Sequence, residues 1–269
     1  MSGAAGIGLD EAAVERAAAL LVDARRRGAT IPAVPAEVRP ATVDDGYRIQ
    51  DEVARRLGQP VVGWKIGCTA EDQQRFLGAD GPFAGRIFAP MAFGSPASLE
   101  GRRFHMRGIE AEFAFRLGRD LPAGGAPYDR AAVADAVVGV HPTIEIVNTR
   151  YDDWLKVGVP SLIADNAAHG AFVCGPAAAD WRGLDLVNHR VTLWIDGREA
   201  ASGTGARVLG DPLTALVWLA NDRARRGDGL EAGQIVTTGT CVGFNPVGPA
   251  AEIVADHGAL GRVVLRFVG

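Results

Sequence analysis

Residues 104–118 read FHMRGIEAEFAFRLG, and apolar side chains alternate with other residues from Ile109 to Leu117. This two-residue period is typical of a β-strand with one buried face. Glu110 and Glu112 lie two residues apart, so their carboxylates are predicted to point to the same face of the strand. The opposite face is strongly apolar. Two carboxylates this close repel each other unless a cation or water lies between them. A divalent cation with oxygen ligands would satisfy both.

Strand patterns dominate the chain from about Arg86 onward, and Asp196-Gly197 is a typical two-residue hairpin turn. One amphipathic helix interrupts them, with Asp211 as its cap and Pro212 at its first position. This pattern predicts a rolled sheet, mostly antiparallel or mixed. The expected strands cover residues 85–90, 104–117, 137–148, 170–175, 189–197, 198–203, 234–242, 252–258 and 261–269.

Helical patterns prevail before residue 80. One helix is expected from Asp10 to the stop at Gly28, a second from Thr42 to Gly58, and a short third one capped by Thr69. The segment PVVGWKIG, residues 60–67, is expected to form a short buried strand. The sequence therefore predicts an α+β fold, with a helical N-terminal segment over residues 1–80 and a β-rich domain over residues 81–269.

The composition excludes several functional classes. The chain of 269 residues has a net charge of −4, which offers no electrostatic footprint for nucleic acid. No run is long and apolar enough to span a membrane, and no signal peptide is evident. Cys68, Cys174 and Cys241 are widely spaced and odd in number, which indicates reduced thiols and predicts a cytoplasmic location.

Seven segments, taken in order, resemble a known family. They are GATIPAVPAEVRPATVDDGYRIQ, GWKIGCT, IEAEFAF, TIEIVNTR, LIADNAAHGAFVCG, LGDPLTALVWLAN and LEAGQIVTTGT. The set is similar to the 2-keto-4-pentenoate hydratase and 2-oxohex-3-enedioate (4-oxalocrotonate) decarboxylase group of the fumarylacetoacetate hydrolase superfamily. The resemblance covers nearly the whole chain. It implies a β-roll-like catalytic domain, Mg²⁺ or Mn²⁺, a 2-oxo acid substrate, a homo-oligomer and a role in the catabolism of aromatic compounds.

The resemblance also assigns roles by position. Glu110, Glu112 and Glu145 match the metal ligands of the family, and Lys65 in GWKIG matches its active-site lysine. Ser161 and Thr240 match positions near the bound substrate. In this interpretation Lys65 shuttles a proton. In the alternative interpretation it lies on an apolar strand and forms a structural ion pair. The guanidinium of Arg86 either binds a substrate carboxylate or pairs with a nearby acid.

One motif departs from the family pattern Asp-x-Pro-Asp-Phe-Gly. The run here is Asp80-Gly81-Pro82-Phe83-Ala84-Gly85, so Asp80 is kept as a candidate acid or base while Phe83 replaces the second acid. The loss of an acid weakens the usual scheme for hydration. An apolar wall at Phe83, however, disfavours a substrate with a second carboxylate, because an unpartnered carboxylate is costly to desolvate.

The leading hypothesis is a metal-dependent lyase that hydrates a 2-hydroxydienoate, or its 2-oxo-enoate tautomer, to a 4-hydroxy-2-oxo acid. The alternatives are decarboxylation of a vinylogous 2-oxo diacid, hydrolysis of an acylpyruvate C–C bond, and a non-catalytic partner subunit. The intact glutamates beside Lys65 argue against the last alternative.

Overall fold

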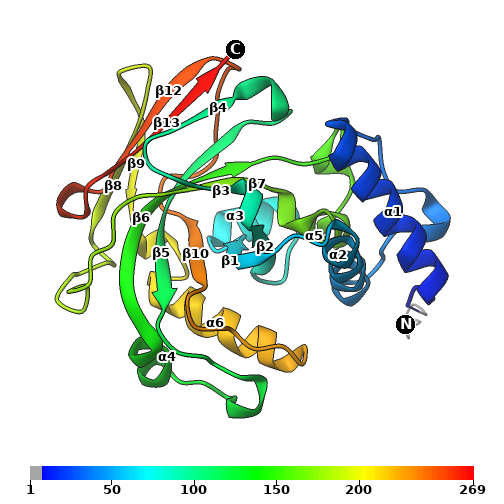
Figure 1. The fold of residues 1–269 in the computed structure, drawn as a ribbon, viewed down its shortest axis with the longest axis horizontal. Coiled ribbons are helices and arrows are strands. Elements are labelled where there is room, and N and C mark those ends of the chain that lie inside the picture. Colours follow the sequence, from blue (N-terminus) through cyan, green and yellow to red (C-terminus); the bar gives the residue numbers. More distant parts are fainter. Residues whose placement is uncertain (1–7) are drawn as a thin grey trace.

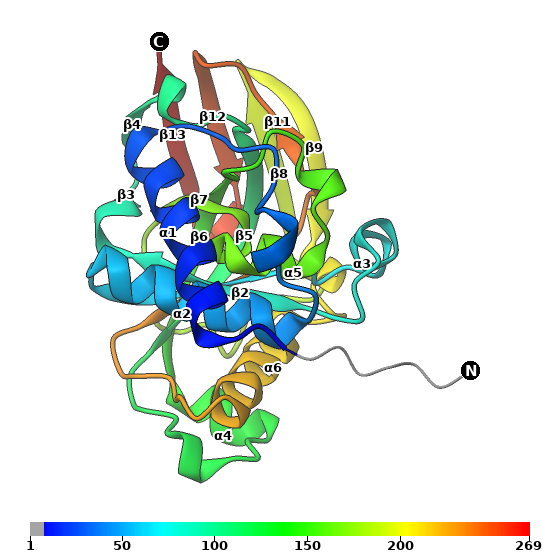
Figure 2. The same cartoon turned by 90° about the vertical axis from the view of Figure 1, so that its right-hand side faces the viewer.

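The larger of two β-sheets runs through the middle of the molecule, and the smaller one lies at one end, opposite α4 and α6 (Figures 1 and 2). The computed structural model describes residues 8–269. The larger sheet has eight strands in the order β2-β1-β10-β5-β6-β7-β3, and β11 also pairs with β5. These strands are β1 (Val61–Gly67), β2 (Phe83–Phe88), β3 (Ala92–Gly94), β5 (Gly108–Leu117), β6 (Val137–Val147), β7 (His169–Cys174), β10 (Ile235–Thr240) and β11 (Asn245–Pro246).

The smaller sheet has five strands in the order β4-β13-β12-β8-β9. They are β4 (Ala97–Glu100), β8 (Arg190–Ile195), β9 (Arg198–Thr204), β12 (Ala251–Asp256) and β13 (Arg262–Val268). Three pairings, β1 with β10, β3 with β7 and β4 with β13, are parallel, and the other pairings are antiparallel. The predicted α+β class with a mixed, rolled sheet is therefore confirmed.

Six α-helices accompany the sheets within residues 8–269, and most of their predicted ends are confirmed. The Asp10 side chain accepts a hydrogen bond from the Ala13 amide at 2.7 Å, and Gly28 ends this helix with a φ of 60°. Thr69 does not cap the third helix, which begins after Ala70 without a side-chain cap. The helices are α1 (Glu11–Arg27), α2 (Val43–Leu57), α3 (Glu71–Leu77), α4 (Arg130–Ala136), α5 (Val159–Ala164) and α6 (Pro212–Arg225).

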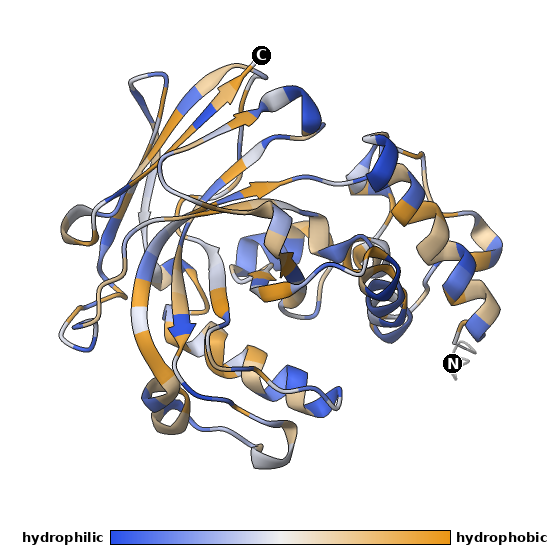
Figure 3. Cartoon of the chain, in the orientation of Figure 1, coloured by the Kyte–Doolittle hydropathy of each residue, from blue (hydrophilic) through white to orange (hydrophobic). Residues whose placement is uncertain are grey.

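The two sheets share one hydrophobic core. Strand β13 buries Val263, Leu265 and Phe267, while its alternate residues are more exposed, so one face of the smaller sheet turns inward. These side chains belong to the same buried cluster as Phe113 of β5 and Ile144 of β6. In Figure 3, hydrophobic and hydrophilic residues accordingly alternate along the strands. The apolar face predicted for β5, on the side opposite to Glu110 and Glu112, is confirmed.

Helices α1 and α2 form a second, smaller core beside the sheets, together with residues after β6. The first 80 residues do not stand apart from the sheet, because β1 lies between β2 and β10. The predicted division at residue 80 separates two neighbouring strands of one sheet, and it stays a prediction. Among the helices of residues 8–269, none combines the length and the apolar character that crossing a membrane requires.

Candidate metal and substrate site

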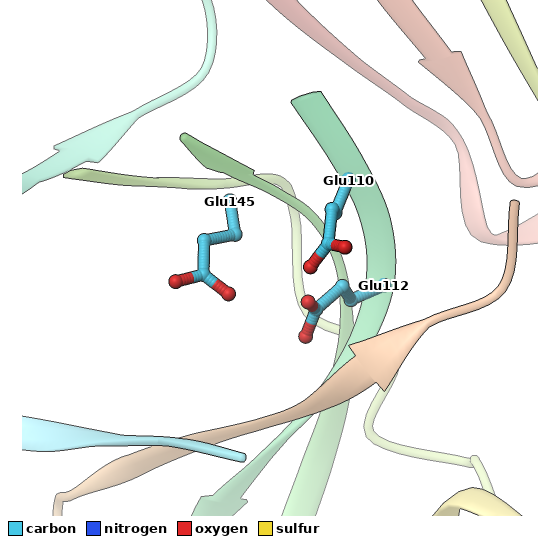
Figure 4. A group of neighbouring side chains, drawn as sticks. All are labelled: Glu110, Glu112 and Glu145. Atoms are coloured by element: carbon cyan, nitrogen blue, oxygen red, sulfur yellow. The ribbon is translucent and has the colours of Figure 1, made fainter. Parts of the chain in front are cut away.

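Three glutamates lie on one face of the β5–β6 pair (Figure 4). Glu110 of β5 stands directly opposite Glu145 of β6 in the antiparallel register, and Glu112 follows one strand step along β5. One carboxylate oxygen from each residue lies within 4.8 Å of the others. All three side chains are buried, with Glu112 and Glu145 at 0 % exposure. The alternating pattern of β5 thus places two carboxylates together, and strand pairing adds the third.

Neighbouring groups orient two of these carboxylates through one oxygen each. Oε2 of Glu112 accepts hydrogen bonds from the Thr237 hydroxyl and from the Gly239 amide, the latter at 2.8 Å. Oε1 of Glu145 lies 2.8 Å from Nδ1 of His169 and 3.5 Å from Nζ of Lys65. The second oxygen of each, Oε1 of Glu112 and Oε2 of Glu145, is buried without a hydrogen-bond partner in the described chain.

The buried carboxylates perturb one another electrostatically. Burial and the charge of Glu145 raise the pKa of Glu110 to about 7. Burial and the charges of Glu145 and Glu110 raise the pKa of Glu112 well above its usual range. Burial would raise the pKa of Glu145 too, but Lys65 and His169 hold it below its usual value. Burial also lowers the pKa of His169, which favours its neutral form at neutral pH.

This arrangement fits a divalent cation. Three carboxylates face one ammonium group and one neutral imidazole, so the fully ionised cluster has a net charge of −2 that a divalent cation would neutralise. Two buried oxygens without partners are available as ligands. Carboxylate oxygens are the ligands that Mg²⁺ and Mn²⁺ prefer. Glu110, Glu112 and Glu145 are therefore suitable residues to hold such an ion.

A cavity of about 240 Å³ opens in front of the glutamates, of which Glu110 is the one that lines it. Lys65, Glu110 and Thr240 line it, together with a mostly apolar wall. The wall residues are Phe76, Leu77, Phe83, Met106, Val147, Trp154, Leu162 and Phe244. The ring of Trp154 lies 6.3 Å from that of Phe76 and 6.2 Å from that of Phe244, so three aromatic residues from separate segments meet here.

Strand register explains why Lys65 and Phe83 share this cavity. Lys65 pairs with Gly85 and Gly67 pairs with Phe83 across β1 and β2, which places residues 65, 67, 83 and 85 on one face. A Cβ atom at Gly67 would meet Nζ of Lys65 at 3.1 Å and the Phe83 ring at 3.4 Å. Glycine at this position therefore leaves the room that the lysine and the phenyl ring occupy.

Three of the residues predicted for the site lie elsewhere. Arg86 pairs with Trp64 in register, on the face opposite to Lys65, and its guanidinium bonds Gln50 and Asp51 at 2.9 and 2.6 Å. Ser161 is buried in α5, and Asp80 is exposed on the loop before β2. None of the three lines the cavity.

The sequence did not single out several residues that contact the site. His169 and Thr237 bond the glutamates directly. Both lie within segments that resemble the family, but no role was assigned to them from the sequence, because their contacts depend on the pairing of β7 with β6 and of β10 with β5. Gln73 of α3 lines the cavity, and its Oε1 is buried without a hydrogen-bond partner in the described residues.

Comparisons with known proteins agree with this geometry. Residues 77–267 match the model of the fumarylacetoacetate (FAA) hydrolase C-terminal domain. The chain is 36 % identical over 256 residues to 2-keto-4-pentenoate hydratase of Paraburkholderia xenovorans (strain LB400), covering 94 % of each chain. It is 32 % identical over 247 residues to 2-hydroxyhexa-2,4-dienoate hydratase of Comamonas testosteroni, covering 90 % of this chain and 91 % of the other.

Among solved structures, 4-oxalocrotonate decarboxylase from Pseudomonas putida G7, complexed with magnesium and adipate, superposes with a TM-score of 0.90. It is 29 % identical and covers 97 % of this chain and 99 % of the other. The expected family, fold and metal chemistry are thus supported by sequence and by structure. The chain belongs to the fumarylacetoacetate hydrolase family, in the group that contains the 2-keto-4-pentenoate hydratases.

Proposed function

We propose that the protein is a metal-dependent hydro-lyase that adds water to a 2-hydroxydienoate, or to its 2-oxo-enoate tautomer, and forms a 4-hydroxy-2-oxo acid. The named hydratases that the chain resembles over most of its length support this reaction. A divalent cation bound by Glu110, Glu112 and Glu145 would supply a Lewis acid for the carboxylate and 2-oxygen of such a substrate.

One observation favours a neutral substrate tail. Among the described residues that line the cavity, Lys65 is the only cation, and it lies beside the glutamates. The rest of the wall is largely apolar, with Phe83 only 6 % exposed. The second carboxylate of a diacid would lose its hydration there without gaining a partner, which is costly. An alkyl or vinyl tail loses nothing in the same place, so the cavity favours hydration over decarboxylation of a diacid.

The chain's own residues have distinct parts in this proposal. Nζ of Lys65, which lines the cavity, holds the proton that the substrate gains or loses during tautomerisation. Thr240 contacts the substrate, and the apolar wall limits the access of bulk water. The unpartnered Oε1 of Gln73 is placed to accept a hydrogen bond from the water that adds. Asp80, Arg86 and Ser161 do not line the cavity, and the roles predicted for them stay predictions.

Decarboxylation of a vinylogous 2-oxo diacid is the second candidate. It is favoured by the similarity in overall structure to the decarboxylase from Pseudomonas putida G7. That reaction needs no positioned water, so the Gln73 carbonyl oxygen would have no role in it. It needs a partner for the distal carboxylate, which the described lining does not provide.

The two candidates are separated by one assay. The purified protein is incubated with Mg²⁺ or Mn²⁺ and either 2-hydroxypenta-2,4-dienoate or 2-oxohex-3-enedioate. We expect loss of dienol absorbance with the first substrate and a much lower kcat/KM with the second, without release of carbon dioxide. Carbon dioxide release from the diacid at the higher kcat/KM would overturn the hydratase assignment.

We further infer a homo-oligomer, on the resemblance alone, and a cytoplasmic location. Cys68, Cys174 and Cys241 are all free thiols, as a reducing compartment requires. Light scattering of the purified protein tests the first inference. Fractionation of the source cells tests the second.

A further inference from the structure

A second cavity, of about 400 Å³, is lined by arginines from three separate segments. Arg25, Arg26 and Arg27 come from the end of α1, Arg103 from the turn before β5, and Arg150 from the segment after β6. No acidic residue lines this cavity among the described residues, although the whole chain has a net charge of −4. It shares no lining residue with the cavity in front of the glutamates.

The position of α1 explains only part of this cluster. Basic side chains in the last turn of a helix interact favourably with its dipole, and Arg27 pairs with Asp23 on the surface. The dark blue end of α1 in Figure 3, opposite the N-terminus, marks this basic turn. Arg103 and Arg150 do not belong to α1, so neither the dipole nor a solvated helix face accounts for their presence in the same cavity.

The buried part of the cluster has more positive than negative charge. Nε of Arg150 donates to Oδ1 of Asp165 at 2.6 Å, and Nη2 of Arg25 lies 3.7 Å from the same oxygen. Nη2 of Arg25 is buried and has no hydrogen-bond partner within residues 8–269. One carboxylate therefore faces two guanidinium groups. Buried charged donors without partners are rare in proteins, because they lose their hydration without compensation.

The rim and floor of the cavity indicate what kind of anion fits. Arg103 is exposed at the rim and forms no ion pair with any described residue. Leu57, Met91 and Phe104 add apolar surface. Guanidinium groups bind carboxylate and phosphate oxygens through paired hydrogen bonds. Apolar surface beside them suits a ligand with a carbon body.

We propose that this cavity is a second ligand site, which binds a small organic dianion carrying carboxylate or phosphate groups between Arg25 and Arg103. Arg150 supports the site by hydrogen-bonding Asp165, while Nη2 of Arg25, 3.7 Å from the same carboxylate, makes no hydrogen bond within residues 8–269 and can donate to the ligand. The site is separate from the proposed catalytic cavity, and its existence does not depend on which reaction occurs there.

Isothermal titration calorimetry of the full chain tests the proposal. The protein is first freed of divalent metal on a chelating resin, so that the glutamates do not attract anions through a bound ion. Succinate and glycerol 3-phosphate serve as probes, and they distinguish a dicarboxylate from a phosphate ester. Arg103→Ala removes one ligand-binding charge. Arg102→Ala is the matched control, because it removes the same charge from the neighbouring exposed residue, which does not line the cavity.

We expect at least one probe to saturate the wild type. Arg103→Ala should raise the Kd of that probe by about tenfold, while Arg102→Ala should change it by less than about twofold. The proposal is overturned if neither probe saturates at millimolar concentration, or if both variants weaken binding equally, since the effect is then general surface charge. It is also overturned if Arg103→Ala alone changes the mass measured by analytical ultracentrifugation, since a second copy then occupies the cavity.

Discussion

Replacing Glu112 by glutamine should have opposite effects on the metal-free and the metal-bound protein. In the metal-free protein, Oε1 of Glu112 is buried without a partner and lies close to two other carboxylates. The amide oxygen of the substituted side chain can still accept from Thr237 and Gly239, and its amide nitrogen would then replace the unpartnered oxygen and donate toward Glu110 or Glu145. Burial and the neighbouring carboxylates raise the pKa of Glu112 well above its usual range, so folding near neutral pH must protonate this group or bury its charge. Glutamine avoids both costs, and the free energy of unfolding should rise by about 1–3 kcal/mol.

The metal-bound protein should respond in the other direction. At a Mg²⁺ concentration about 100 times the dissociation constant, binding to the folded state alone adds about 2.7 kcal/mol to the free energy of unfolding. Glu112→Gln replaces one of three anionic ligands by a neutral one, so most of this increment should vanish together with turnover. Urea unfolding, with a chelator and with excess Mg²⁺, measures both free energies for each protein.

Glu37→Gln is the control, because Glu37 is exposed on a short turn of 3₁₀-helix and lies outside the triad. It should leave the metal increment unchanged. The reasoning is refuted if Mg²⁺ stabilises Glu112→Gln as much as the wild type, or if the wild type remains fully active in excess chelator.

Three further outcomes are expected. Lys65→Ala should lower kcat about 100-fold while the Mg²⁺ increment in urea unfolding persists; unchanged turnover would leave Lys65 as a structural ion pair. Phe83→Asp should lower kcat/KM for an apolar-tailed substrate by at least about tenfold, whereas Phe83→Leu should stay within about threefold, and equal values for the two variants would contradict the role of an apolar wall. Arg55, followed by Arg56, holds the pKa of Glu52 down to about 2 from 4.5, so this carboxylate stabilises the fold above its unfolded pKa and loses that effect as the pH falls toward 2. Glu52→Gln should therefore cost about 1 kcal/mol at pH 7 and nothing near pH 2, and a cost that does not change with pH would exclude this charge effect.

The local features of the fold were predictable because they depend on neighbours in sequence. The alternation from Ile109 to Leu117 correctly predicted which face of β5 is apolar and that Glu110 and Glu112 share the other, although the structure buries both faces. The caps at Asp10, Thr42 and Asp211 were also confirmed. Each of these features needs only side-chain spacing and the hydrogen-bonding capacity of one residue.

The surroundings of the site were not predictable, because they depend on the pairing of distant strands. Arg86 faces away from Lys65 since it pairs with Trp64, and a one-residue shift of register would have brought it to the other face. No spacing rule fixes that register across the intervening loop and α3. His169 reaches Glu145 through the pairing of β7 with β6, whose connection contains α5. The positional resemblance was needed to add Glu145 and Lys65 to the two glutamates of β5.

The parallel pairing of β1 with β10 has a consequence for how the site forms during folding. β5 and β6 are consecutive long strands of the chain and need only a modest loop to meet, whereas β1 must find a partner near the opposite end of the chain. Closing a longer loop costs more conformational entropy and slows the pairing of distant segments. The carboxylates should therefore gather before Lys65 arrives, and a divalent cation present during refolding should speed refolding more than it slows unfolding. The site would then be assembled from its metal-binding half outward, with the lysine as the last part to arrive.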